Sequence, residues 1–93
     1  LEVRIIWSDE ALDYLERLIE FLPSTGARTA CRVAERLLNG PDKLLTAPRL
    51  GERINRAGPE EVRRILVGDY ELRYEVRSDI IVVLRVWHTR EDR

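Results

Sequence analysis

Reactive side chains are scarce in this sequence of 93 residues, which contains one cysteine and one histidine. Nucleophilic catalysis needs a nucleophile beside an oriented base, and a metal site needs several ligands at matched spacing. Cys31 and His88 are too few for either, and the carboxylates are scattered along expected solvent faces. We therefore expect no catalytic triad, no metal ion and no disulfide within the chain.

Glycine-rich phosphate loops and long apolar runs are also missing. The glycines at positions 40, 51, 58 and 68 match neither the Walker nor the dinucleotide spacing, so no nucleotide cofactor is expected. The sequence shows no apolar run of about 18 residues and no basic-then-apolar leader, which argues against a membrane span and a signal peptide. A lone cysteine suits a reducing compartment, and we expect a cytoplasmic protein.

Net charge is close to zero, because 16 basic residues are balanced by 17 acidic ones. The chain as a whole therefore exerts no bulk attraction on nucleic acid, and any such contact must be local. Residues 1–22 carry a net charge of −4 and the remainder +3. Arginine outnumbers lysine 15 to 1, and its planar guanidinium suits carboxylates, phosphates and aromatic faces. This composition favours a recognition surface.

The hydrophobic pattern predicts a strand followed by two helices. Residues 2–7 begin as an alternating run and end in β-formers, and Ser8 then offers a helix N-cap. Apolar residues recur at helical spacing after this cap, at Ala11, Leu12, Leu15, Leu18, Ile19 and Leu22. A second helical period covers residues 27–38, and the turn sequence Asn-Gly-Pro ends it. We expect an antiparallel helix hairpin with Cys31 in its core.

The second half of the sequence predicts a loop and a strand meander. Residues 41–60 hold three of the four prolines, so no long regular element fits there. The period then changes to two and predicts strands at 62–67, 70–76 and 80–88. In the middle strand one face carries Tyr70, Leu72, Tyr74 and Val76, and the other carries Glu71, Arg73, Glu75 and Arg77.

The last strand is apolar at every position from Ile80 to Leu84, which is typical of an interior strand or of one that a partner covers. The helices can cover only one of its faces. The whole pattern predicts a single two-layer α+β domain over residues 1–93 with the order β-α-α-β-β-β. In this domain a helix hairpin packs on a mainly antiparallel four-stranded sheet.

Three segments of the second half are distinctive in combination. They are Val62-Arg63-Arg64-Ile65-Leu66-Val67-Gly68-Asp69-Tyr70, Leu72-Arg73-Tyr74 and Leu84-Arg85-Val86-Trp87-His88-Thr89-Arg90. Together with the element order, they resemble the ParE/RelE toxin superfamily over nearly the whole chain. The resemblance implies the toxin of a type II toxin–antitoxin pair, held inactive by a cognate antitoxin, ParD-like or similar, whose C-terminal segment folds on the toxin. Operator DNA would be bound only through the antitoxin complex.

The two branches of this superfamily differ in chemistry. RelE-like members cleave mRNA on the ribosome, whereas ParE-like members are linked to inhibition of DNA gyrase. The alignment puts Glu71 where RelE-like enzymes carry a phosphate-binding arginine, and a carboxylate there would repel the phosphate. Arg90 matches their late arginine, but their C-terminal tyrosine is missing. We therefore expect the ParE-like branch with no catalytic residue; a RelE-like endoribonuclease and an inactive binding module are the alternatives.

Three groups of site residues follow from this interpretation. The expected target-binding residues are Trp87, His88, Arg90 and Arg93; composition alone also fits a Trp87 that caps the core. The expected antitoxin contacts combine part of the helix hairpin with the outer face of the last strand, at Leu12, Leu15, Ile19, Ile81, Val83 and Trp87. A surface facing nucleic acid would be formed by Arg49, Arg53, Arg56, Arg63 and Arg64.

Overall fold

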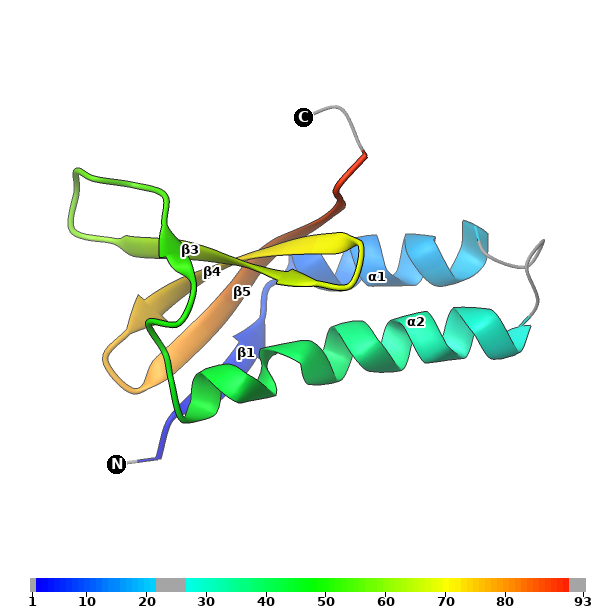
Figure 1. The fold of residues 1–93 in the computed structure, drawn as a ribbon, viewed down its shortest axis with the longest axis horizontal. Coiled ribbons are helices and arrows are strands. Elements are labelled where there is room, and N and C mark those ends of the chain that lie inside the picture. Colours follow the sequence, from blue (N-terminus) through cyan, green and yellow to red (C-terminus); the bar gives the residue numbers. More distant parts are fainter. Residues whose placement is uncertain (1, 22–26, 91–93) are drawn as a thin grey trace.

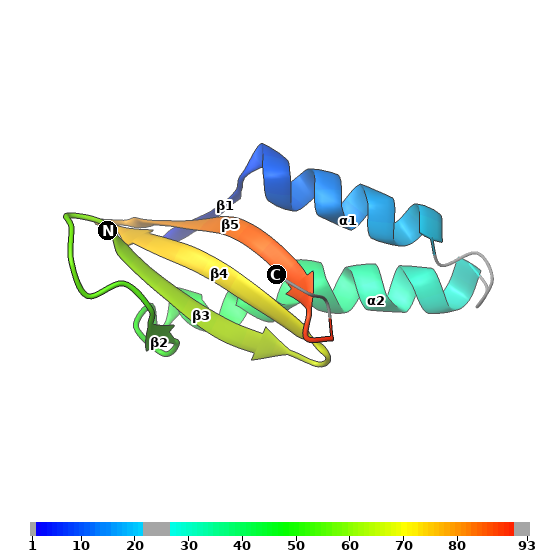
Figure 2. The same cartoon turned by 90° about the horizontal axis from the view of Figure 1, so that it is seen from above.

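A computed structural model describes residues 2–21 and 27–90. Two helices run side by side along one face of a sheet (Figures 1 and 2). The elements are β1 (Arg4–Trp7), α1 (Asp9–Phe21), α2 (Ala27–Asn39), the 3-10 helix η2 (Gly40–Leu45), β2 (Glu52–Arg53), β3 (Glu61–Val67), β4 (Tyr70–Arg77) and β5 (Ile80–His88). The predicted α+β class is confirmed, and the predicted elements occur in the predicted order, with the short strand β2 in addition.

The sheet has the strand order β1-β5-β4-β3-β2. Strand β1 pairs with β5 in parallel, whereas every other neighbour is antiparallel. The helix pair carries the chain from β1 across the sheet before the meander begins, which is why these two strands run in the same direction. Strand β5 is therefore interior, as its apolar sequence indicated.

The region 41–60 contains more regular structure than predicted. Pro41 lies at the start of η2, where its fixed φ suits a helical turn and its missing N–H is not needed. Two residues of β2 then pair with Arg63 and Arg64 on β3, which makes five strands where four were expected. A strand of two residues is too short to show an alternating pattern, so it could not be predicted from the sequence.

Helix α1 begins at the predicted cap. The Ser8 hydroxyl accepts a hydrogen bond from the Ala11 N–H at 3.1 Å and donates one to the Leu84 carbonyl at 2.7 Å. The first bond satisfies a free N–H of the first turn, and the second ties the start of α1 to β5. Neither α1 nor any other helix in the described part of the chain is long and apolar enough to cross a membrane.

The hydrophobic core lies between the helix pair and the sheet. It contains Ala11, Leu15, Ala34, Leu37, Leu44, Ile65, Val67, Leu72, Tyr74, Ile81, Val83 and Val86. The alternation predicted for β4 is confirmed, because Leu72 and Tyr74 are fully buried on the helix side. Burying a side chain of this size contributes roughly 1.5–3 kcal/mol relative to leaving it exposed.

A β-bulge in β5 corrects the predicted faces of that strand. Arg73 pairs with Arg85 and Tyr74 pairs with Val83, so Leu84 is an extra residue between them. The insertion reverses the alternation: Val83 points to the helices, whereas Trp87 lies on the outer face. The prediction that Ile81 and Val83 lie on the outer face with Trp87 is wrong, and both are in the core.

The predicted place of Cys31 is also wrong, because this residue is exposed. Ala34 and Leu37 define the buried face of α2. Around the helix, Cys31 lies about 60° from Ala34 and about 120° from Leu37, so it is beyond the edge of that face. Its small neighbours in the sequence suggested a core position, but the angle around the helix decides its exposure.

Candidate functional site

The outer face of the sheet carries a row of charged side chains along β4. Glu71 and Glu75 are only 2% and 8% exposed, although neither helix of the described residues covers this face. Glu71 binds the Nε of Arg73 at 3.1 Å and lies 3.6 Å from a terminal nitrogen of Arg64. Glu75 binds Arg77 at 2.9 Å. The long arginine side chains therefore shield these carboxylates from water.

Trp87 lies close to two guanidinium groups. The Arg73 Cζ is 4.4 Å and the Arg85 Cζ 5.1 Å from the centre of its ring, which is cation–π distance. Cross-strand pairing brings this Arg–Trp–Arg cluster (Arg73, Trp87 and Arg85) together, because Arg73 is opposite Arg85 and Glu71 is opposite Trp87. Arg85 also binds Glu10 of α1 at 3.4 Å, so the cluster connects β4 to α1.

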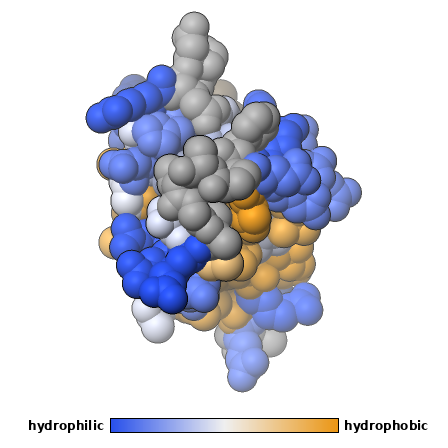
Figure 3. All heavy atoms as spheres, turned by 90° about the vertical axis from the view of Figure 1, so that its right-hand side faces the viewer, coloured by the Kyte–Doolittle hydropathy of each residue, from blue (hydrophilic) through white to orange (hydrophobic). Residues whose placement is uncertain are grey.

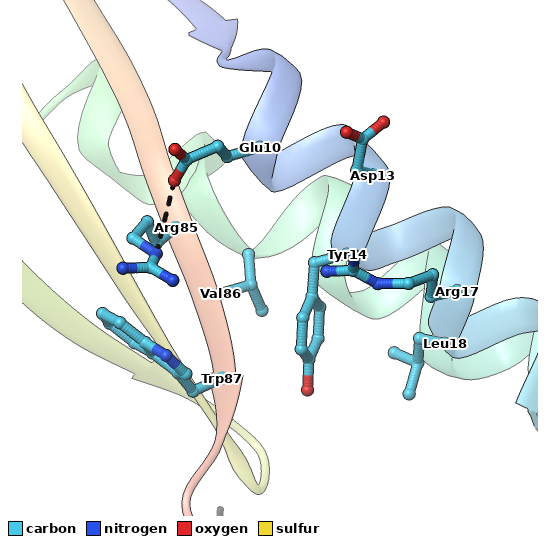
Figure 4. Close-up of a pocket in the computed structure, with 8 residues that line it drawn as sticks. All are labelled: Glu10, Asp13, Tyr14, Arg17, Leu18, Arg85, Val86 and Trp87. Atoms are coloured by element: carbon cyan, nitrogen blue, oxygen red, sulfur yellow. Dashed lines mark ion pairs between the residues drawn. The ribbon is translucent and has the colours of Figure 1, made fainter. Parts of the chain in front are cut away.

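A groove of about 540 Å³ separates α1 from the end of β5. Figure 4 shows its lining side chains, which are Glu10, Asp13, Tyr14, Arg17, Leu18, Arg85, Val86 and Trp87. Trp87 forms part of the wall and does not cap the core. The lining combines two aromatic rings, an apolar floor and charges of both signs, which suits a protein segment better than a bare polyanion.

The residues after Trp87 are anchored near this groove. The His88 N–H donates to the Tyr14 hydroxyl at 3.1 Å, and the His88 ring meets the Tyr70 ring edge-on at 5.1 Å. Thr89 donates its N–H to the Asp69 carbonyl at 2.8 Å, and Arg90 is exposed. Trp87, His88 and Arg90 are thus close together at one end of the sheet; Arg93 lies outside the described residues.

The predicted nucleic-acid-facing arginines lie near the opposite edge of the sheet, where β2 pairs with β3. Glu61 binds Arg63 at 2.7 Å and Arg49 at 2.9 Å. The hydrogen bond from Arg63 is the main cause that holds the pKa of the Glu61 carboxyl below its ordinary value, and Arg49 adds to the effect. Arg49 and Arg63 are therefore already paired with a carboxylate of the same domain.

Of the other three arginines predicted to face nucleic acid, two are also bound within the protein. Arg64 binds Glu52 at 3.0 Å, and Arg53 donates to the Asn55 carbonyl at 2.8 Å. Arg56 has no ion pair with a residue that the structure describes. Four of the five predicted arginines are therefore bound within the protein.

Tyr74 holds the loop before β2 in place, a role that was not predicted from the sequence. Its hydroxyl accepts the Gly51 N–H at 2.9 Å and donates to the Pro48 carbonyl at 2.9 Å. Burial raises the pKa of this hydroxyl, and the bond from Gly51 opposes the rise. A tyrosine among the apolar residues of a core-facing strand was the signal, since a buried hydroxyl needs a partner.

The predicted antitoxin contacts separate into exposed and buried residues. Leu12 and Ile19 are 40% and 42% exposed on α1, whereas Leu15, Ile81 and Val83 are buried in the core and have little surface to offer. Figure 3 shows hydrophobic surface at the end of the molecule where the helix pair lies. Five further large apolar residues of the described part of the chain are exposed and were not predicted to be: Ile6 on β1, Leu38 on α2, Leu45, Leu50 and Leu66.

Comparisons with known proteins agree with this fold. The sequence model of the family described as "ParE toxin of type II toxin-antitoxin system, parDE" matches residues 5–93. No curated protein matches the sequence. Among solved structures, the chain resembles one in the chromosomal ParDE TA system from P. aeruginosa, with a TM-score of 0.76 and 16% identity over 94% of this chain and 96% of that chain.

It also resembles a chain of the archaeal RelE-RelB complex from Pyrococcus horikoshii OT3, with a TM-score of 0.66 and 19% identity over 99% of this chain and 100% of that chain. At these identities the two structures show the fold alone. The family match, in contrast, extends over almost the whole sequence, and it confirms the resemblance carried by the β3–β4 turn and the end of β5. The chain therefore belongs to the ParE toxin family and is a type II toxin of the ParE/RelE superfamily.

Proposed function

We propose that this toxin acts in the cytoplasm by inhibiting DNA gyrase and that a ParD-like antitoxin neutralises it. The observation that favours gyrase over mRNA as the target is the charge on the outer face of the sheet. A metal-free ribonuclease needs cations free to stabilise the charge that develops on the scissile phosphate. In this chain the corresponding position of β4 holds the carboxylate of Glu71, and Arg73 and Arg64 are turned toward it.

The state of Glu71 strengthens this argument. The residue is 2% exposed and bound by arginine, so its negative charge is part of the folded structure and cannot turn away from an approaching phosphate. Arg73 is also held against Trp87, which removes its freedom to reach a substrate. Near the β2–β3 edge, Arg49 and Arg64 are also bound, to Glu61 on β3 and to Glu52 on β2. These contacts support a toxin without nuclease activity.

The groove beside the Arg–Trp–Arg cluster is the surface that we assign to the target. Trp and Arg are the residues that most often dominate protein interfaces, and here they lie beside His88 and Arg90. Glu10 and Asp13 on the opposite wall weaken any nonspecific grip on DNA. A shaped contact with a protein target is consistent with this mixture of charges.

The antitoxin is assigned to the apolar side of α1. An antitoxin segment that is disordered alone would fold on Leu12 and Ile19, and apolar burial at roughly 25 cal/mol per Å² would offset its ordering cost. We expect Leu12→Asp to weaken antitoxin binding at least about tenfold, because it places a charge in an apolar contact. Leu50→Asp, a change at an exposed leucine near the opposite sheet edge, is the matched control. Equal affinity of both variants would refute this assignment.

Induced expression without antitoxin tests the proposed function. Growth, mRNA integrity and the DNA-damage response are scored together in the same culture. We expect growth to stop and the DNA-damage response to rise while mRNA remains intact. Codon-positioned mRNA cleavage on ribosomes would instead assign a RelE-like nuclease, and unaffected growth would assign an inactive binding module.

A further inference from the structure

Three arginines lie in one row across the outer face of the sheet. Arg64 on β3 is directly opposite Arg73 on β4, and Arg73 is directly opposite Arg85 on β5. Like charges that face each other across neighbouring strands destabilise a sheet. Departures of this kind from stable pairing are expected mainly at functional sites. The row is therefore a candidate for binding an anionic group.

Two arginines of the row are held at one nitrogen by carboxylates of the same domain. The Nε of Arg73 binds Glu71 at 3.1 Å, and the Nε of Arg85 lies 3.4 Å from Glu10. The terminal nitrogens of Arg73 and Arg85 form no hydrogen bond with a residue that the structure describes. Figure 4 shows the terminal nitrogens of Arg85 on the side of the guanidinium away from Glu10. These donors are open to a bound group.

Trp87 orients the same two guanidinium groups. Contact with its flat ring, at 4.4 Å from Arg73 and 5.1 Å from Arg85, restricts their rotation. Their side chains are still 35% and 59% exposed, so a ligand can reach them. Arg64, in contrast, uses its Nε and a terminal nitrogen to bind Glu52. Arg73 and Arg85 are thus ordered before a ligand arrives, which lowers the entropy lost on binding.

We propose that Arg73 and Arg85, held against Trp87, bind the carboxylate of an aspartate or glutamate side chain on the target protein. We call this pair of arginines the carboxylate clamp. The inference rests on the proposed function, because it names the chemistry by which the protein target is recognised. A carboxylate presents two oxygens in one plane, which match the planar donors of a guanidinium. A guanidinium that is held in place cannot follow a substrate, but it can receive a group that docks beside it.

A nucleic-acid backbone fits the clamp less well than a single carboxylate. The arginines of the row are paired with three carboxylates, those of Glu10, Glu52 and Glu71. Asp13 adds a further negative charge on the wall of the nearby groove. A polyanion gains its affinity from an excess of positive charge, and these carboxylates cancel that excess. One carboxylate needs only the local donors of the clamp.

Arg85 is the first residue to change, because its partner Glu10 is exposed and tolerates the loss of the pair. We expect Arg85→Gln to weaken binding to purified gyrase without DNA about 30-fold. Arg85→Lys keeps the charge but lacks the planar fork, so a loss of about fivefold should remain. Arg77→Gln is the matched control and should bind as the wild type does. Its side chain is also 59% exposed with its Nε on a carboxylate, but it is opposite Ile80, at the far end of β5 from Trp87.

Arg73→Lys tests the other half of the clamp. Lysine keeps a cation beside the buried Glu71 carboxylate, so the fold persists, which circular dichroism and urea denaturation check. We expect the affinity for gyrase to fall about fivefold to tenfold, because the flat fork and its contact with the Trp87 ring are lost. Wild-type affinity of both Arg73→Lys and Arg85→Gln would overturn the clamp, while gyrase would stand as the target.

Growth inhibition tests the clamp independently of the identity of the target. Expressed without antitoxin, Arg85→Gln should inhibit growth much less than Arg77→Gln, and equal inhibition would overturn the clamp for any target. A wild-type chain that does not bind gyrase would refute the proposed target and leave the clamp to this growth comparison. The carboxylate would be overturned in favour of a phosphate by either of two results. One is mRNA cleavage that Arg85→Gln abolishes, and the other is gyrase binding that requires DNA and that Arg85→Gln weakens.

Discussion

Tyr74 shows how one residue joins the core to the loop before β2. Its ring is fully buried between the layers, while its hydroxyl bridges Gly51 and Pro48. Gly51 must be glycine for this bridge, since a Cβ there would collide with the Arg64 carbonyl and the Tyr74 hydroxyl. The same two hydrogen bonds fix the position of the loop before β2, which contains Arg49.

We predict that Tyr74→Phe lowers the free energy of unfolding by about 1–3 kcal/mol, because the buried Gly51 N–H loses its acceptor. Urea denaturation measures this change. The raised pKa of the Tyr74 hydroxyl also predicts a pH dependence. The folded protein keeps the phenolic proton at pH values at which the unfolded chain has released it. The free energy of unfolding therefore falls as the pH rises above about 10. Because Tyr74→Phe lacks this hydroxyl, its unfolding free energy should fall less at alkaline pH than that of the wild type. Equal falls in the two proteins would contradict the claim that burial raises the pKa of Tyr74.

Glu61 gives the corresponding prediction in acid. Arg63 and Arg49 lower the pKa of its carboxyl in the folded state, so the unfolded chain takes up a proton first as the pH drops below about 4.5. The stability that this carboxylate contributes is present above that pH and is lost below it. Glu61→Gln should therefore flatten the acid fall of the unfolding free energy.

Glu60→Gln is the matched control, because the Glu60 carboxylate forms no ion pair with a described residue. Its backbone carbonyl, which accepts the Asn55 amide at 2.6 Å, is unaffected by the change. Equal acid profiles of the two variants in denaturation experiments between about pH 3 and 6 would show that Glu61 is not the group responsible.

At the scale of elements, the long periodic segments could be predicted and the irregular ones could not. The cap at Ser8, the helix pair and the β3–β4–β5 meander all have strong local signals, and the structure confirms them. The bulge at Leu84 has none: every residue from Ile80 to Leu84 is apolar, so both alternations read equally well. This ambiguity moved Ile81 and Val83 from the predicted outer face into the core.

The candidate site was predictable to a similar degree. Trp87 and Arg90 could be singled out from the unusual composition near the end of β5. The partners that hold the Trp87 ring, Arg73 and Arg85, depend on cross-strand pairing and on the bulge, which no local pattern encodes. The burial of Glu71 was also unexpected, because alternation alone places it on an open face.

The segment that follows β5 gives a prediction at this scale. Removing residues 90–93 leaves the bond from Thr89 to Asp69 intact, and the exposed Arg90 side chain does not join the core. We expect the truncated chain to lose growth inhibition, with antitoxin affinity unchanged and the unfolding free energy within about 0.5 kcal/mol of the wild type. The point variant Arg90→Gln should reproduce part of the loss.

Growth assays and denaturation of both variants check this expectation. A truncated chain that remains fully toxic would place the active surface elsewhere. The loop with Arg49, Arg53 and Arg56 would then become the better candidate for contact with the target. Loss of stability together with toxicity would show instead that residues 90–93 support the fold.

Across the whole molecule, charge is separated between the two edges of the sheet. Carboxylates line α1, which packs beside β5 near the β1 edge, whereas arginines gather at the β2–β3 edge. The groove with the Arg–Trp–Arg cluster lies next to the acidic side. In our account the antitoxin binds the apolar side of α1 at Leu12 and Ile19, the groove contacts the target, and glutamates of the same domain neutralise the arginines at the β2–β3 edge.

Inhibition of a target protein without any nuclease step is the central claim, and DNA supercoiling by purified gyrase tests it most directly. The chain is added to gyrase and relaxed plasmid, with and without the antitoxin. We predict that the chain alone blocks supercoiling and that an equimolar amount of antitoxin restores it. Full supercoiling at concentrations of the chain that stop growth when expressed would contradict the account.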